Sequence, residues 1–138
     1  MFEIAMFENA RATWSPRVLS LLRIMTGLLF LQHGLAKYIQ FPHVPQFDSI
    51  AVASLPGVGG LVELVCGALV TVGLFTPIAA LLASGEMAIA YFIAHAPRGF
   101  FPILNGGSLA VLYCFVFFYL IFAGGGPWSV DAAMRKRA

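Results

Sequence analysis

Seven polar side chains interrupt the long apolar stretches of this sequence, and their chemical types are those that bind small polar molecules and exchange protons. Glu63, His33 and His95 are the candidate proton-exchanging, catalytic groups. The candidate ligand-binding groups are Arg23, Lys37, Glu86 and Asn105. A charged side chain at the centre of a bilayer costs about 2.5–3.5 kcal/mol on insertion scales, so such residues persist where they face protein or water.

The spacing of these residues places them on helix faces lined with small side chains. One stripe with helical period consists of Arg23, Gly27, Phe30, Gly34 and Lys37, with His33 beside it. Two further stripes consist of Gly60, Glu63, Gly67 and Thr71, and of Ala79, Ala83, Glu86, Ala90 and Ala94. Small residues let helices approach closely, so we expect the charged groups to meet inside a helix bundle.

The composition requires that these helices lie in a membrane. Of 138 residues, 60% are hydrophobic and only 10% are charged, whereas soluble domains carry about 25% charged residues. Four apolar segments, at about 18–36, 57–75, 78–95 and 107–123, are each near the ~20 residues that a helix needs to cross a bilayer. They lack the polar–apolar alternation of membrane strands. The predicted fold is therefore all-α, an integral membrane four-helix bundle, and soluble or disordered classes are excluded.

Basic residues predict the orientation and the domain organisation. Five basic residues flank the bundle on the side of the two termini, and only two lie on the other side, so both termini are expected in the cytoplasm. Residues 1–16 are predicted to be a cytoplasmic or interfacial segment, with Phe2, Met6 and Trp14 at the membrane edge. Residues 17–126 form the membrane domain, and 127–138 a basic tail. A run of three basic residues is too short for a nucleic-acid interface.

Helix depth and direction predict where the polar groups meet. At ~1.5 Å per residue, the outward half of the bundle should contain Lys37, His33, Glu63, His95 and Asn105. Arg23 lies nearer the cytoplasmic end, where its side chain extends to the surface or reaches inward to Glu86. Two interpretations remain open: buried Glu63–Lys37 and Glu86–Arg23 pairs that fix helix register, or a polar pocket for a ligand.

Metal and thiol chemistry are the less favoured alternatives. His33, His95 and Glu63 are suitable ligand types, but no HxxxH or similar spacing is present, and we predict no metal site. Cys66 and Cys114 lie in apolar segments without a CxxC motif. They are expected to pack as small hydrophobic residues, the alternative being a redox-active pair of facing thiols.

Three segments together resemble the DoxX family of small bacterial four-helix membrane proteins. They read LLRIMTGLLFLQHGLAKY, then LPGVGGLVELVCGALVTVGLFTPIAA, then FFPILNGGSLAVLYCFVFFYLIFAGGGPWSVD, and the resemblance covers about residues 17–131. The family is associated with membrane oxidoreductase activity, and one branch resembles a subunit of thiosulfate:quinone oxidoreductase. The resemblance implies a bacterial inner-membrane location and marks the same seven polar positions. Family members commonly have Glu after the NGG motif, whereas this chain has Ser108 and so lacks that carboxylate.

These observations predict an accessory subunit of a membrane oxidoreductase near the quinone pool, with a polar pocket that holds a quinone. No haem ligand pair, flavin motif or iron–sulfur cysteine set is present, so no cofactor is expected to be covalently bound, and electrons come from a redox partner protein or the substrate.

Whether the chain catalyses a reaction is left open. The alternative is a non-enzymatic scaffold or assembly factor that uses the aromatic run 113–119, and the least favoured is a small-solute carrier. Expected partners are the lipid bilayer, that redox protein and a second copy of the chain.

Overall fold

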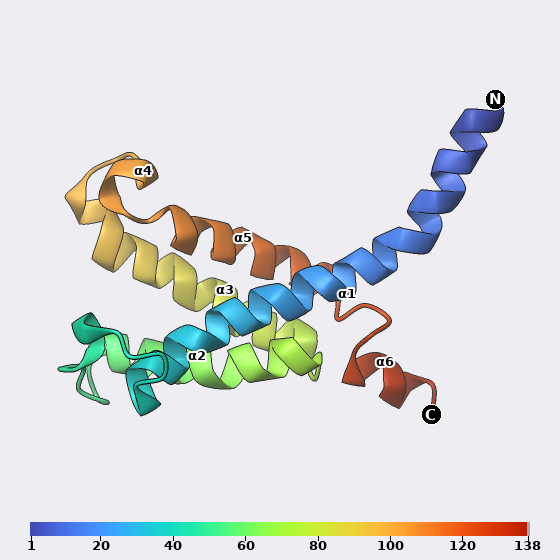
Figure 1. Ribbon diagram of the computed structural model, residues 1–138. Helices are drawn as coiled ribbons and strands as arrows, with labels where there is room; N and C mark the ends of the chain where they lie inside the picture. Colours follow the sequence, from blue (N-terminus) through green and yellow to red (C-terminus); the bar gives the residue numbers. More distant parts are fainter. Residues whose placement is uncertain (138) are drawn as a thin grey trace.

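The computed structural model describes residues 1–137, and this part of the chain is helical without strands (Figure 1). Its long helices are α1 (Phe2–Ile39), α2 (Leu55–Val72), α3 (Thr76–Ala90) and α5 (Ser108–Ala123). Short helical segments are the 3-10 helix Pro45–Phe47, the π-helix Tyr91–His95, the 3-10 helix Ala96–Arg98, α4 (Pro102–Asn105) and α6 (Val130–Arg135). The all-α prediction is confirmed.

The helices have the length and surface of membrane helices. Glu3–Ile39, Leu55–Val72 and Thr76–Arg98 are each long and apolar enough to cross a bilayer, and α5 is an apolar helix of 16 residues. At 1.5 Å per residue α5 spans about 24 Å, somewhat less than a typical hydrocarbon core of about 30 Å. Large apolar side chains such as Leu61, Leu82 and Phe115 point outward and are exposed. Three to four apolar helices of this kind fit the predicted membrane bundle.

The chain runs up and down the bundle, so that distant segments meet at its two ends. Helix α1 packs on α2, α2 packs on α3, and α3 packs on α5. Residues 40–54 and 96–107 lie at one end, which we call the loop end, and both termini lie at the other, the terminal end (Figure 1). The cytoplasmic location of the terminal end stays a prediction from the basic residues.

The N-terminal segment is part of the first helix. α1 runs without interruption for 38 residues through Pro16, so the segment predicted to be cytoplasmic or interfacial is helical and continuous with the membrane helix. Its location outside the membrane stays a prediction. The first turns of α1 point away from the bundle (Figure 1), and Trp14 is exposed there with the Arg17 guanidinium 5.2 Å from its ring centre. Proline removes one helical hydrogen bond and bends a helix without ending it, which explains the continuous but bent α1.

Glycines allow the backbones of α1 and α2 to touch. A Cβ atom on Gly34 would lie 2.5 Å from the Leu64 nitrogen, and one on Gly67 would lie 2.7 Å from the Leu31 Cα. Both distances are shorter than any side chain tolerates, so only glycine permits this approach. The predicted stripes of small residues on these two helices therefore face each other, as expected for membrane helix pairs.

The third stripe is only partly correct. Ala79 and Ala83 are fully buried in the core beside Phe30 and Phe117, but Ala94 is exposed. The helix changes to π geometry at Tyr91–His95, and its wider turns rotate the last residues away from the face that α3 presents to the core.

Candidate functional site

A buried ion pair joins the end of α1 to α2. The Lys37 ammonium donates a hydrogen bond to Glu63 Oε1 at 2.9 Å and lies 2.8 Å from Glu63 Oε2. The two side chains are only 11% and 5% exposed. The predicted Glu63–Lys37 pair is thus present. Both partners are needed for the stability of such a pair, because removal of either one would leave the other as an unpaired buried charge.

Two adjacent glycines of α2 make room for charged side chains from both neighbouring helices. A Cβ atom on Gly60 would lie 2.8 Å from Lys37 Cδ, and one on Gly59 would lie 2.8 Å from Glu86 Oε1. Gly59 precedes Glu63 by four residues, one helical turn, and so lies on the same face of α2. Glu86, from α3, therefore reaches α2 close to the ion pair, where the charges of Glu63 and Lys37 both act on it. We call Lys37, Glu63 and Glu86 the carboxylate cluster.

The carboxylate cluster has more hydrogen-bond acceptors than donors. The Lys37 ammonium lies close to both oxygens of Glu63, whereas Glu86 Oε2 is buried without a hydrogen-bond partner in the described chain. An unsatisfied buried acceptor costs about 1–3 kcal/mol. The cluster can therefore accept a hydrogen bond or a proton from a ligand.

Two aromatic groups lie beside the cluster. His33 is half-buried, its Nδ1 is 2.9 Å from the Leu29 carbonyl oxygen, and its ring meets the Tyr113 ring edge-on with centres 6.2 Å apart. Both residues lie within electrostatic range of Glu63. Tyr113 was not among the predicted site residues. Its signal in the sequence is a single phenol on the inner face of a Phe-rich helix, where a buried hydroxyl normally has a polar neighbour.

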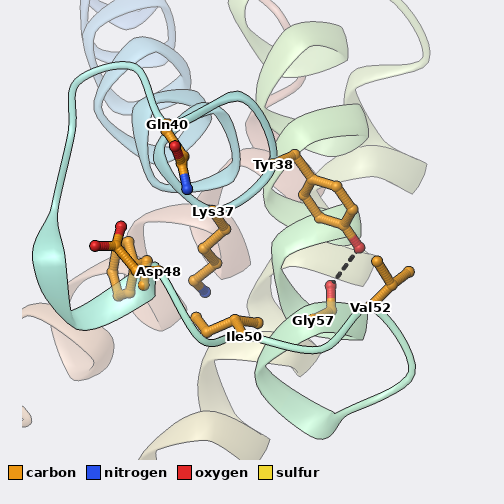
Figure 2. A pocket seen from close by; sticks show the side chains of 8 residues that line it. Lys37, Tyr38, Gln40, Asp48, Ile50, Val52 and Gly57 are labelled. Atoms are coloured by element: carbon orange, nitrogen blue, oxygen red, sulfur yellow. Dashed lines mark hydrogen bonds between the residues drawn. The ribbon is translucent and has the colours of Figure 1, made fainter.

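A cavity of about 230 Å³ opens beside Lys37 at the loop end (Figure 2). It is lined by Lys37, Tyr38, Gln40, Phe47, Asp48, Ile50, Val52 and Gly57. The Tyr38 hydroxyl donates to the Gly57 carbonyl at 2.8 Å and so ties α1 to the start of α2 (Figure 2). A second cavity of about 240 Å³ is lined by Gln32, His33, Ala36, Pro42, Val44 and Phe47. Phe47 therefore borders both cavities.

His95 and Asn105 form a second polar group, which holds the connection from α3 to α5. Buried Asn105 donates through Nδ2 to the Gly99 carbonyl at 2.8 Å and accepts at Oδ1 from the Gly107 nitrogen. His95 Nδ1 is 3.1 Å from the Asn105 carbonyl oxygen. Within residues 1–137 no hydrogen bond or ion pair links His95 or Asn105 to Lys37 or Glu63. Of the five polar groups that we expect to meet in this half of the bundle, Lys37 and Glu63 contact each other and His33 lies nearby. His95 and Asn105 form a group of their own. Ser108 begins α5 with an exposed side chain.

Arg23 lies toward the terminal end, as predicted, but neither direction predicted for its side chain is correct. Its side chain is fully buried and does not extend to the surface, and it does not pair with Glu86. Its guanidinium donates to the carbonyl oxygens of Val70, Thr71, Gly125 and Trp128. Four of its five N–H groups are thus bound to backbone, which explains why this charge is retained inside the bundle.

Asp131 closes the same end by capping α3. Its carboxylate accepts hydrogen bonds from the Phe75 and Thr76 nitrogens at 2.8 and 2.9 Å. Burial raises the pKa of Asp131, but these hydrogen bonds, together with the charge of Arg135, outweigh burial and hold the pKa below its ordinary value. A group with a lowered folded pKa stabilises the protein above its unfolded pKa and loses that contribution as the pH falls through the folded value.

We therefore expect Asp131→Asn to lower the unfolding free energy by about 1 kcal/mol near neutral pH, because the amide keeps one acceptor oxygen for two backbone N–H groups and loses the charge. The difference from the wild type should shrink as the pH falls below about 4, where the wild-type carboxylate becomes protonated. Thermal unfolding in detergent between pH 3 and 7 measures it, with Glu8→Gln, an exposed carboxylate of the first helix, as the control. A difference independent of pH would contradict the charged cap.

The remaining candidates for thiol and metal chemistry are the two cysteines and the His, Cys, Asp and Glu side chains. Both cysteines are free; Cys66 is buried, and Cys114 is half-buried with its carbonyl oxygen accepting from the Ser84 hydroxyl at 2.9 Å. Within residues 1–137 no group of three or more His, Cys, Asp or Glu side chains is arranged to hold a metal ion.

Comparison with known proteins shows that this site lies in the part of the chain that matches a protein-family model. The family model DoxX matches residues 18–96, the segment that contains the whole carboxylate cluster. An uncharacterized protein from Haemophilus influenzae is 41% identical over 133 residues, which cover 94% of this chain and 99% of that protein. An uncharacterized membrane protein from Mycobacterium tuberculosis is 28% identical over an alignment of 158 positions, gaps included, which covers 98% of this chain and 96% of that protein. No solved structure matches the chain.

Proposed function

The chain belongs to the DoxX family, and on that premise we propose that it is an accessory subunit of a membrane oxidoreductase and binds the head group of a quinone-type molecule. The observation that carries the proposal is the buried Lys37–Glu63 pair beside Glu86: Glu86 Oε2 has no hydrogen-bond partner in the described chain, and Lys37 borders a cavity. A polar site of this kind inside a membrane bundle is the expected signature of a ligand or proton pathway.

The size and position of the cavity suit a head group. Its volume of about 230 Å³ is below the ~300–1,000 Å³ of pockets that enclose a whole drug-sized ligand. A single ring fits this volume, while an apolar tail would extend into the lipid that surrounds the bundle. The Lys37 ammonium, which borders the cavity, would donate to an oxygen of the ring.

The proton transfers of quinone chemistry can be assigned to three of the polar side chains. Conversion of a quinone to its diphenol takes up two electrons and two protons, and the reverse reaction releases them. We assign proton exchange to Glu63 and His33, with Glu86 as a second acceptor. His95 would act through the connection that it holds with Asn105. The sequence has two cysteines and no CxxC motif, so the electrons are assigned to a redox partner subunit.

The proposed location is the inner membrane of a bacterium, with both termini in the cytoplasm. Support comes from the bacterial relatives and from the basic residues near both termini. In this orientation the cavity at the loop end would lie near the outer surface of the membrane.

Native mass spectrometry on protein extracted gently from its own membrane tests the proposal. We expect a bound species with the mass of a quinone, and its loss in Glu63→Gln. The glutamine keeps an oxygen for the Lys37 ammonium, so the variant should fold, and Glu8→Gln is the control that keeps the ligand. Protein that carries only phospholipid and a second polypeptide would instead support the scaffold alternative.

One observation favours that alternative function. We predicted an exposed aromatic run at 113–119, but Tyr113 and Phe117 are buried in the core, and the exposed residues are Phe115, Phe118, Tyr119 and Phe122. These four rings form an apolar outer surface of α5 that another membrane protein could contact. A scaffold would use this surface and would keep its partner in Glu63→Gln.

A further inference from the structure

The first helix ends in a residue whose backbone conformation is unusual for its type. Gln40 follows α1 with φ 55° and ψ 35°, in the left-handed region, and its backbone N–H donates to the Leu35 carbonyl. Any Cβ atom is crowded by its own backbone in this region, so glycine is the usual residue at this position after a helix. Glutamine is therefore less stable here than glycine would be.

Other helices of this chain have glycine at the same position. The residues that directly follow α2, α4 and α5 are Gly73, Gly106 and Gly124, with φ values of 74°, 75° and 73°. Helix α1 is the one of these four that is followed by a side chain. Because the requirements of the helix end do not explain Gln40, its side chain is a candidate for another role.

The Gln40 side chain lies in the wall of the cavity that Lys37 borders. Figure 2 shows it extending from the end of α1 toward Lys37. The hydrogen bonds of the polar side chains around this cavity join Lys37 to Glu63, Tyr38 to Gly57 and Asp48 to His43. None of them involves the exposed amide of Gln40, which is therefore available to a ligand.

The amide of Gln40 has a property that its charged neighbours lack. Lys37 can only donate a hydrogen bond and the carboxylate of Asp48 can only accept one, whereas an amide has two N–H donors and a carbonyl acceptor. Rotation about its terminal torsion, which is soft, turns either group toward the cavity. A quinone oxygen accepts a hydrogen bond and the hydroxyl of the diphenol donates one, so the amide suits both.

We infer that Gln40 is a ligand-binding residue of this cavity, and that its side-chain amide binds an oxygen of the ring in both the quinone and the diphenol form. The ring would keep this contact when it is reduced or oxidised, because the amide donates to one form and accepts from the other. This inference rests on the proposed function and identifies a specificity-determining contact of the same site.

Equilibrium dialysis on the full chain in lipid nanodiscs tests the inference, with empty nanodiscs as the reference for partitioning. The probes are duroquinone, its hydroquinone under exclusion of oxygen, and durene, which has the same ring and methyl groups but no oxygen atom. Gln40→Gly should weaken the binding of both oxygen-bearing probes about fivefold, the effect of one lost hydrogen bond. It should leave the binding of durene unchanged.

The thermal unfolding temperature distinguishes a binding role from a structural one. Gln40→Gly should raise it by about 3 °C, because glycine adopts the left-handed conformation without crowding. A residue that only held the loop in place would lose stability together with affinity. Phe75→Gly is the matched control, since Phe75 is the other non-glycine residue of the described chain with a positive φ, 50°, and lies at the terminal end before α3. It should keep wild-type affinity.

The outcomes separate this inference from the proposed function. Wild-type affinity in Gln40→Gly, a loss that durene shares, or a lower unfolding temperature overturns the inference and leaves the proposed function standing. A loss for one redox form alone overturns the binding of both forms by Gln40. If neither duroquinone nor its hydroquinone binds the wild type, the proposed function and the inference both fail.

Gln40→Asn keeps the inference testable if the glycine variant does not fold. Asparagine tolerates the left-handed conformation, and its amide is one methylene shorter. We expect this variant to fold and to bind both oxygen-bearing probes more weakly than the wild type. Unchanged affinity for them would show that the reach of the Gln40 amide is not used.

Discussion

Replacement of Arg23 by methionine should destabilise the protein by more than about 3 kcal/mol. The Arg23 guanidinium is the donor to carbonyl oxygens of α2 and of the segment after α5. Each buried group left unsatisfied costs about 1–3 kcal/mol. Unfolding by SDS titration in detergent micelles measures the loss. Detachment of the segment after α5 should also make the chain sensitive to chymotrypsin at Trp128.

Arg23→Lys and Arg98→Met are the controls for this prediction. Lysine keeps the charge but lacks the planar fork that reaches several carbonyls at once, so it should restore only part of the stability. Arg98 is exposed, and its exchange for methionine should have little effect. Wild-type stability in Arg23→Met would mean that Arg23 does not hold the terminal end together.

Replacement of Lys37 by methionine should cost about 3–5 kcal/mol, because it leaves the buried Glu63 carboxylate without its partner. Combining Lys37→Met with Glu63→Gln removes both charges and should recover most of that loss. The methionine fills much of the space of the lysine stem against Gly60. Thermal unfolding of the two single variants and the double variant, compared as a double-mutant cycle, measures the coupling between the side chains.

The same set of variants distinguishes a structural ion pair from a functional one. The double variant should be folded and should bind no quinone-type ligand, because it lacks the ammonium and the carboxylate of the site. A folded double variant that still holds its ligand would restrict the pair to a structural role. Equal stability of Lys37→Met and the wild type would contradict the burial of the pair.

Arg23 and Asp131 at the terminal end differ from Glu86 at the loop end in how fully their polar atoms are hydrogen-bonded. At the terminal end, Arg23 and Asp131 donate to or accept from backbone groups that need a partner at the ends of α2 and α3. At the loop end, Glu86 keeps a buried oxygen without a hydrogen-bond partner in the described chain. Saturated groups stabilise the fold, whereas unsaturated buried groups are available to a ligand. Because the donors of Arg23 are bound to backbone carbonyl groups, we assign it a structural role instead of the predicted role in ligand binding.

The sequence by itself determined the helices, their membrane character and the closely packed faces of α1 and α2. These properties depend on the length of the apolar segments and on the spacing of small residues, which are local and periodic. The Lys37–Glu63 pair was also predictable, because both residues lie on those faces near the same end of antiparallel helices. The DoxX resemblance follows from the same segments and is confirmed by the match over residues 18–96.

Only the tertiary structure decided which partners the other polar groups have. Arg23 binds carbonyls up to 105 positions away, and nothing in the spacing of residues 18–36 specifies a backbone carbonyl as a partner. The π-helix turns His95 to Asn105, and a loop without regular periodicity places Phe47 over Lys37. Periodicity fixes the face of a helix on which a residue lies. The rotation of each helix about its axis and the path of each loop depend on packing between segments that are distant in the chain.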